Sequence, residues 1–251
     1  MSAPLLQVLG VQKRFGGLVA LDDVGLALEA GELHALIGPN GAGKTTLIQI
    51  LAGAETANAG VIRFSGHDVT QWPMHRRARL GLARSYQITN LFADFTALDN
   101  LALAVQARRG GGHGCWRPVV RQSAVFEDAR ATLAQIGLAE RADAPARTLA
   151  HGEQRQLELG LALASGARLL LLDEPMAGMG REESARMLGL IAMLKRTTTI
   201  LLVEHDMDAV FQLADRITTL VYGRVVASGA PEEIRRNPEV RRAYLGEETA
   251  A

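Results

Sequence analysis

The chain has 251 residues and a mass of 26.9 kDa, and its 27 Lys and Arg residues balance its 27 Asp and Glu residues. With 48% hydrophobic and 22% charged residues, the composition is that of a globular protein and excludes a disordered chain. The zero net charge provides no overall positive field, so we expect no nucleic-acid partner. We also expect no internal disulfide, secretory signal or membrane span, because Cys115 is the single cysteine and no long apolar run occurs.

The first third of the chain is predicted to form short strands joined by glycine-containing turns. Leu5–Phe15, Leu18–Leu28 and Val61–Ser65 predict a small antiparallel layer. Between them, His34–Ile37 is continuously apolar, which is typical of a parallel strand buried on both faces. The segment Lys44–Ala52 reads as the helix that follows this strand.

The middle of the chain is predicted to be a helical insertion over residues 88–155. Ala97–Arg108, Val125–Ile136 and Gly152–Ala164 carry helical patterns, and the glycine-rich segment 109–118 predicts an exposed loop. We therefore expect one α/β domain over residues 1–251 whose core consists of residues 1–87 and 156–251.

The last third returns to alternating strands and helices. Leu169–Leu172 and Ile200–Val203 predict buried parallel strands, and Glu182–Lys195 and Asp206–Ala214 predict the helices that follow them. Because the carboxyl ends of parallel strands share one edge of a sheet, we expect reactive groups there. Downstream, the sequence predicts a hairpin turn and two short helices, over Val221–Val225, Pro231–Arg236 and Glu239–Leu245.

The segment Gly38–Thr45 fits the pattern G-x-x-x-x-G-K-[ST] between a buried strand and a helix. Successive backbone N–H groups and a helix N-terminus can neutralise a triphosphate, and Lys44 can reach its β- and γ-phosphates. The hydroxyl of Thr45 is expected to ligate Mg²⁺. The residues expected to bind ATP in this segment are Gly38, Pro39, Asn40, Gly41, Ala42, Gly43, Lys44, Thr45 and Thr46.

Two carboxylates and a histidine follow the predicted buried strands. Asp173 is expected to hold Mg²⁺ through water, and Glu174 suits a general base that polarises the attacking water. His205 follows the other strand and is expected to contact the γ-phosphate, although a histidine at a strand end can also be purely structural. The histidines without metal-ligand spacing are assigned to structure or solvent, namely His34, His67, His75 and His113.

With these motifs in place, the chain resembles an ATP-binding-cassette (ABC) ATPase. Gln87 matches the Q-loop, and Leu149–Glu158 matches the ABC signature with its helix. The resemblance covers essentially the whole chain and implies a P-loop NTPase with a RecA-like core, an antiparallel β layer and a helical subdomain. It also implies that Gln87 takes part in catalysis and ligates the metal.

The same resemblance implies a head-to-tail dimer, of two copies or of two related chains, that encloses two ATP molecules. The signature of each subunit then contacts the nucleotide held by the other, through Ala150, His151, Gly152 and Glu153.

A finer resemblance is to the ATP-binding subunits of branched-chain amino-acid importers, and related subunits serve urea or amide uptake. It rests on Phe15–Asp22, Arg84–Gln87, the glycine-rich insert and Val240–Gly246. Phe15 matches the aromatic position that stacks on adenine, and Val19 is expected to flank the base. Phe15 could instead be a buried aromatic residue of the β layer.

The signature departs from the common Leu-Ser-Gly-Gly-Gln. Ala150 lacks a hydroxyl, and Glu153 introduces a carboxylate that a protonated His151 could offset. Either change could lower ATPase activity. The loop Met176–Gly180 lacks the aspartate that many relatives carry, which puts signalling between the two ATP sites in doubt.

The leading interpretation is a transporter motor, peripheral to the cytoplasmic face of the inner membrane. Its partners would be permease subunits and, indirectly, a periplasmic solute-binding protein. Leu91 and Phe92 could anchor the permeases beside the Q-loop, or could pack the subdomain interface.

Other classes of function remain as alternatives to an importer. They are an exporter ATPase of the lipopolysaccharide type, a soluble ABC ATPase acting on DNA or ribosomes, and a P-loop GTPase or kinase. The soluble ABC proteins usually carry tandem cassettes or a long coiled coil, and this chain has neither. An Asn-Lys-x-Asp guanine motif is also absent from the sequence.

Overall fold

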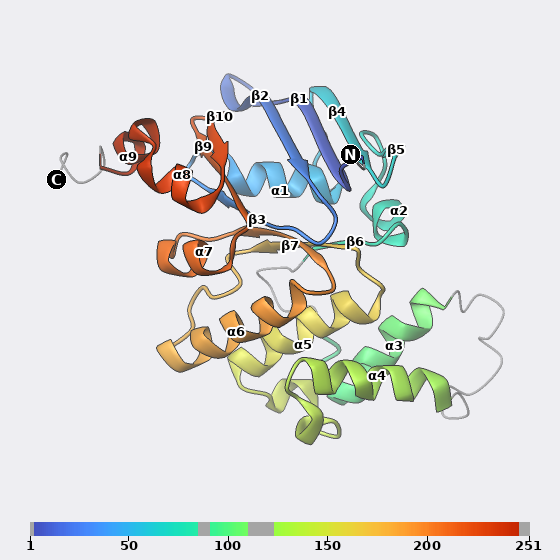
Figure 1. The fold of residues 1–251 in the computed structure, drawn as a ribbon. Coiled ribbons are helices and arrows are strands. Elements are labelled where there is room, and N and C mark those ends of the chain that lie inside the picture. Colours follow the sequence, from blue (N-terminus) through green and yellow to red (C-terminus); the bar gives the residue numbers. More distant parts are fainter. Residues whose placement is uncertain (1–2, 85–90, 110–122, 246–251) are drawn as a thin grey trace.

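The computed structural model describes residues 3–84, 91–109 and 123–245, which form two sheets with helices between and around them (Figure 1). One sheet has the strand order β2-β1-β4-β5 and is antiparallel throughout. The predicted antiparallel layer is therefore confirmed. Its strands are β1 (Leu6–Phe15), β2 (Leu18–Leu28), β4 (Ala59–Phe64) and β5 (His67–Asp68).

The second sheet has six strands in the order β10-β9-β3-β8-β7-β6. Its pairs are parallel except for the β9–β10 hairpin. The three predicted buried strands thus lie side by side, and their carboxyl ends meet at one edge of the sheet. The strands are β3 (Leu33–Ile37), β6 (Leu82–Arg84), β7 (Leu169–Asp173), β8 (Thr199–Val203), β9 (Arg216–Val221) and β10 (Arg224–Gly229).

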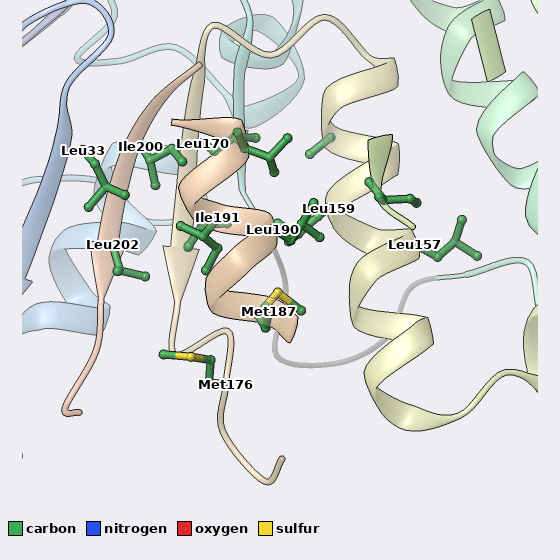
Figure 2. Packing of buried hydrophobic residues seen from close by; sticks show 14 of the residues in the cluster. Leu33, Leu157, Leu159, Leu170, Met176, Met187, Leu190, Ile191, Ile200 and Leu202 are labelled. Carbon is green, nitrogen blue, oxygen red and sulfur yellow. The ribbon is translucent and has the colours of Figure 1, made fainter. Parts of the chain in front are cut away.

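The apolar runs of the parallel strands are continuous because both faces of the sheet are covered. Leu170 and Leu172 of β7 belong to one hydrophobic core, whereas Leu169 and Leu171 belong to another. Helix α1 (Lys44–Ala52) lies between the two sheets in the second core (Figure 1). Figure 2 shows the first core, where Leu170 and Leu202 face side chains of α6 (Arg181–Leu194).

The three helices predicted for the middle segment are present, and they pack on one another. They are α3 (Ala97–Arg108), α4 (Ser123–Gln135) and α5 (His151–Ala164). Thr96 is the N-cap residue of α3, and its hydroxyl accepts a hydrogen bond from the N–H of Asp99 at 3.0 Å. Helix α5 runs through residue 155 without a break, so the proposed boundary at 155 falls inside a helix. Most of the predicted loop, residues 110–118, lies outside the described residues.

The remaining helices complete the fold. The predicted hairpin turn is confirmed at Tyr222-Gly223, between β9 and β10. Among the elements that the sequence did not predict are the edge strand β6 and helix α2, both of them short. Across the ranges given above, we find no helix with the length and apolar character needed to cross a membrane. The other helices are α2 (Met74–Arg79), α7 (Met207–Leu213), α8 (Pro231–Arg236), α9 (Pro238–Leu245) and the 3₁₀ turns η2 (Ala139–Arg141) and η3 (Ala146–Thr148).

Candidate functional site

The phosphate loop (Gly38–Thr45) connects β3 to α1, and two of its glycines lie too close to neighbouring backbone for any other residue. Gly38 has φ 152°, and a Cβ there would lie 2.0 Å from the carbonyl oxygen of Leu220. Gly43 has φ 103°, and a Cβ there would lie 2.5 Å from the carbonyl oxygen of Ala20. Both contacts are too short for any side chain, so the loop can fold this way only with glycine at these positions.

The loop gathers positive groups at the start of α1. The ammonium group of Lys44 is largely buried and donates hydrogen bonds to the carbonyl oxygens of Gly38 at 2.6 Å and Pro39 at 3.0 Å. Helix α1 begins at Lys44, so its first backbone N–H groups point into the loop. Thr45 is exposed and Thr46 is half-buried in the first turn. This arrangement can neutralise a polyanion such as a triphosphate.

The β9–β10 turn ties the phosphate loop to the antiparallel layer. The N–H of Gly223 donates to the carbonyl of Ala42 at 3.0 Å, and the carbonyl of Gly223 accepts from the N–H of Asp22 at 2.8 Å. Ala20, which limits Gly43, lies one residue after Val19 on β2. The predicted adenine-contacting residue Val19, half-buried in the structure, is therefore held close to the loop.

Phe15 ends β1 and is 45% exposed, so its assignment as a buried aromatic residue of the β layer is wrong. The ammonium group of Lys13 lies 4.7 Å from the centre of its ring. Lys13 is held in turn by the carboxylate of Glu55 and the carbonyl of Thr56, both at 2.7 Å. Since these residues follow α1, the ring of Phe15 is tied to the helix that starts at the phosphate loop.

Asp173 ends β7 and is 3% exposed. Burial raises the pKa of its carboxyl group, and the neighbouring Glu174 adds to this rise, while Arg84 opposes it. Its Oδ2 accepts a hydrogen bond from Arg84 Nη2 at 3.2 Å, and its buried Oδ1 has no hydrogen-bond partner within the described part of the chain. A carboxylate oxygen of this kind fits a cation ligand, directly or through water.

Glu174 has a left-handed backbone with φ 49°, which is unfavourable for a residue with a side chain. Its N–H donates to the carbonyl of Val203 at 2.9 Å, which holds the turn against the end of β8. Backbone strain of this kind is common at functional sites, where the surrounding structure holds a side chain in one direction. The observation therefore supports a functional role for the half-buried Glu174 carboxylate.

The end of β8 carries Glu204 and His205, which differ sharply in exposure. The side chain of His205 is 69% exposed, and its Nδ1 lies 3.7 Å from Glu204 Oε2. Glu204 is 2% exposed, and burial raises the pKa of its carboxyl group although backbone N–H donors oppose the rise. Glu204 was not among the residues predicted for the site, although its position directly after a buried strand is a signal for such a role.

The signature segment (Leu149–Glu153) forms the start of α5, with Ala150 as its N-cap residue. Glu153 Oε2 accepts a hydrogen bond from the N–H of Ala150 at 2.9 Å, and its Oε1 accepts one from Arg141 Nε at 3.0 Å. Partial burial would raise the pKa of Glu153, but these two partners outweigh it and lower that pKa. Arg141 is thus a cation that the structure pairs with Glu153, whereas the side chain of His151 is exposed.

The structure brings most of the predicted residues together but leaves the signature apart. The phosphate loop, Asp173, Glu174 and His205 lie at the adjoining carboxyl ends of β3, β7 and β8. The signature helix packs in the core on the other face of the sheet from α1 (Figure 1). Gln87 lies outside the described residues.

An apolar groove lies beside this site, between α2, β6 and α5. Met74, Leu82 and Leu161 line it, and Arg84 lies at its wall. Farther along the chain, Leu91 packs against the first core, as its alternative assignment to the subdomain interface predicted.

Phe92, the second predicted anchor, lies at the surface. It is 59% exposed, and its ring stacks on that of Phe95 at 5.4 Å between ring centres. Of the two predicted anchors, Phe92 is therefore the one that offers an exposed apolar side chain.

Comparison with known proteins agrees with this geometry. Residues 21–177 match the family model described as ABC transporter, and residues 224–250 match the model described as branched-chain amino acid ATP-binding cassette transporter. The chain is 40% identical to the high-affinity branched-chain amino acid transport ATP-binding protein BraF of Pseudomonas aeruginosa, over 98% of this chain and all of the relative. It is 42% identical, with the same coverage, to the protein LivG of Escherichia coli K12 that has the same description.

Solved structures lead to the same family. The ADP conformation of MJ1267, an ATP-binding cassette of an ABC transporter, matches with a TM-score of 0.84 and 26% identity, over 98% of this chain and all of that one. The chain belongs to the ATP-binding-cassette family of transporter ATPases, whose members bind nucleotide and hydrolyse ATP.

Proposed function

We propose that this chain is the ATP-hydrolysing motor subunit of an importer for branched-chain amino acids. The observation that carries the proposal is its 40–42% identity to BraF and LivG along nearly the whole chain. The match of residues 224–250 to the branched-chain amino acid family adds to it. The subunit would work at the cytoplasmic face of the inner membrane, bound to permease subunits.

The site supports in-line attack of water on the γ-phosphate of ATP. The backbone N–H groups of the phosphate loop hold the phosphates, and Lys44 neutralises the β- and γ-phosphates. Glu174 accepts a proton from the attacking water, and His205 binds the γ-phosphate from the neighbouring strand end. Phe15, exposed beside the loop, offers its ring to adenine, with Val19 at its edge.

The site also has the ligands that Mg²⁺ prefers. Asp173 offers a buried carboxylate oxygen, and Thr45 offers an exposed hydroxyl at the start of α1. Gln87 would complete the ligand set, as the family resemblance implies. The cation would supply charge neutralisation for the phosphates.

The separation of the signature from the phosphate loop supports a head-to-tail dimer. Across such a dimer, the N-terminus of α5 at Ala150, with His151 and Gly152, would face the nucleotide of the second subunit. The Glu153 carboxylate is turned toward Arg141, so we propose that it caps the helix and does not contact phosphate.

The apolar groove beside β6 and the exposed Phe92 support a permease docking surface next to the site. In this proposal, a helical subdomain that contains α3, α4 and α5 moves against the core built on the two sheets. The transported solute would be delivered to the permeases by a periplasmic binding protein.

Reconstitution tests this proposal. The chain would be purified with the permeases that accompany it in its own host and placed in proteoliposomes. We expect ATP-dependent uptake of leucine, isoleucine and valine when the binding protein is supplied. ATP-dependent uptake of urea or amides in their place, or net export, would contradict the assignment.

A further inference from the structure

The carboxylate of Glu204 joins two loops that carry proposed catalytic residues. Glu204 directly follows β8 and is 2% exposed. Its Oε1 accepts a hydrogen bond from the backbone N–H of Met176 at 3.2 Å, two residues after Glu174. Its Oε2 accepts one from the backbone N–H of His205 at 3.1 Å. One side chain therefore fixes the loop after β7 and the loop after β8 at the same time.

The burial of this carboxylate makes both bonds important. A charged group that loses its water must be stabilised by protein donors, and backbone N–H groups are rigid donors. The direct bond between Glu174 N and the carbonyl of Val203, at 2.9 Å, joins the same two strand ends. Together these bonds set the spacing between the backbones of Glu174 and His205.

We propose that Glu204 is a positioning residue for ATP hydrolysis. It holds the Glu174 turn and His205 at the spacing in which both side chains face one phosphate group. Glu204 is buried and acts through the two loops that it hydrogen-bonds, so it is not itself a catalytic residue. This inference rests on the roles proposed above for Glu174 and His205.

Glu204→Gln tests the inference because it keeps the shape but replaces an acceptor oxygen by an NH₂ group that cannot accept a backbone N–H. We expect kcat to fall about tenfold or more, since small displacements of reacting groups are costly. ATP affinity should stay within about twofold, because the phosphate loop makes the principal contacts with ATP.

Glu32→Gln is a matched control, because Glu32 directly precedes β3 and so lies at the end of that strand opposite to the phosphate loop. Glu32 also accepts a backbone hydrogen bond, from Glu29 at 2.8 Å, and contacts a histidine, His34 Nδ1 at 2.9 Å. The same chemical change there should leave kcat unchanged. An equal loss of kcat in both variants would mean that Glu204 has only a general structural role.

A double-mutant cycle separates positioning from a loss of stability. In a His205→Ala background, the loss of kcat caused by Glu204→Gln should shrink at least about threefold, because the group that it positions is gone. Equal losses in both backgrounds, or an unchanged kcat, would overturn the inference. If Glu204→Gln does not fold, Glu204→Asp is expected to give the same pattern, because its shorter carboxylate cannot reach both N–H groups.

Glu174→Gln distinguishes a failure of the proposed function from a failure of the role inferred for Glu204. If Glu174→Gln hydrolyses ATP normally, the proposed function of the site fails. If Glu174→Gln is slow but Glu204→Gln is not, only the role of Glu204 fails.

Discussion

Replacing Ala150 with serine should stabilise the signature helix and, separately, strengthen the ATP-bound dimer. Ala150 is the N-cap residue of α5 and has no side-chain acceptor, whereas Glu153 already accepts the Ala150 N–H at 2.9 Å. A serine hydroxyl would accept the N–H of Glu153 and complete a reciprocal capping box. An N-cap serine is worth about 1 kcal/mol over alanine, which in a chain of this size raises Tm by about 2–4 °C.

Ala230→Ser is a control with nearly identical geometry. Ala230 is the N-cap residue of α8 with φ −63° and ψ 152°, compared with −61° and 158° for Ala150. Glu233 accepts its N–H at 2.9 Å, just as Glu153 accepts that of Ala150. Thermal unfolding without nucleotide should therefore show a similar rise in Tm for both variants.

Only Ala150→Ser should change dimerisation. Its hydroxyl could also donate to a phosphate held by the second subunit, and a hydrogen bond to a charged acceptor is worth at most about 1.5–3 kcal/mol. In a Glu174→Gln background with ATP and Mg²⁺, sedimentation should show a dimer about tenfold tighter, which corresponds to the lower end of this range. Equal dimer affinities for the parent, Ala150→Ser and Ala230→Ser, or a weaker dimer for Ala150→Ser, would refute a trans contact at residue 150.

Three further substitutions have clear expected outcomes. Lys44→Ala should abolish ATP binding in a titration while the circular dichroism spectrum stays unchanged, because it removes the cation that the phosphate loop holds. An unchanged ATP affinity would contradict the assignment of the phosphate loop as the nucleotide site. Arg77→Met should destabilise the fold by about 3 kcal/mol or more in urea unfolding, because buried carbonyl acceptors lose their donor. Arg77 is 2% exposed, donates to the carbonyls of Ile50 and Leu51 at 2.7 Å, and has its pKa lowered by burial to about 10. Tyr222→Asn should raise the free energy of unfolding by about 0.5–1 kcal/mol, because Tyr222 is 87% exposed with φ 47° and asparagine tolerates this left-handed conformation. A lower Tm for the variant would contradict this expectation.

Much of the fold could be predicted because the pattern of apolar residues and glycines in the sequence matches the burial and the turns of the folded chain. The predicted bounds of α1 are identical to those observed, because a glycine in a left-handed conformation stands at each end of the helix. Gly43 precedes Lys44 at the start, and Gly53 follows Ala52 at the end. The parallel strands were recognisable because both faces are buried, which makes their sequences continuously apolar.

The parts that could not be predicted depend on long-range contacts. Edge strand β6 has only three residues, and it is defined by its pairing with β7 and not by any pattern of its own. Arg77 is a charged residue in a sequence position typical of solvent exposure, and its burial follows from carbonyl groups supplied by distant segments. Glu204 follows a buried strand, but the two loops that it joins become neighbours only when β7 and β8 pair. The pairing of Glu153 with Arg141 likewise requires η2 to fold back onto the start of α5.

The most direct test measures ATP binding and ATP hydrolysis in the same preparations of the parent chain and Glu174→Gln. If Glu174 is the general base of a site built on the phosphate loop, both proteins should bind ATP with similar affinity. The variant should hydrolyse it about 10²–10⁴-fold more slowly. A rate within a few-fold of the parent would contradict the assignment of these strand ends as the centre of hydrolysis.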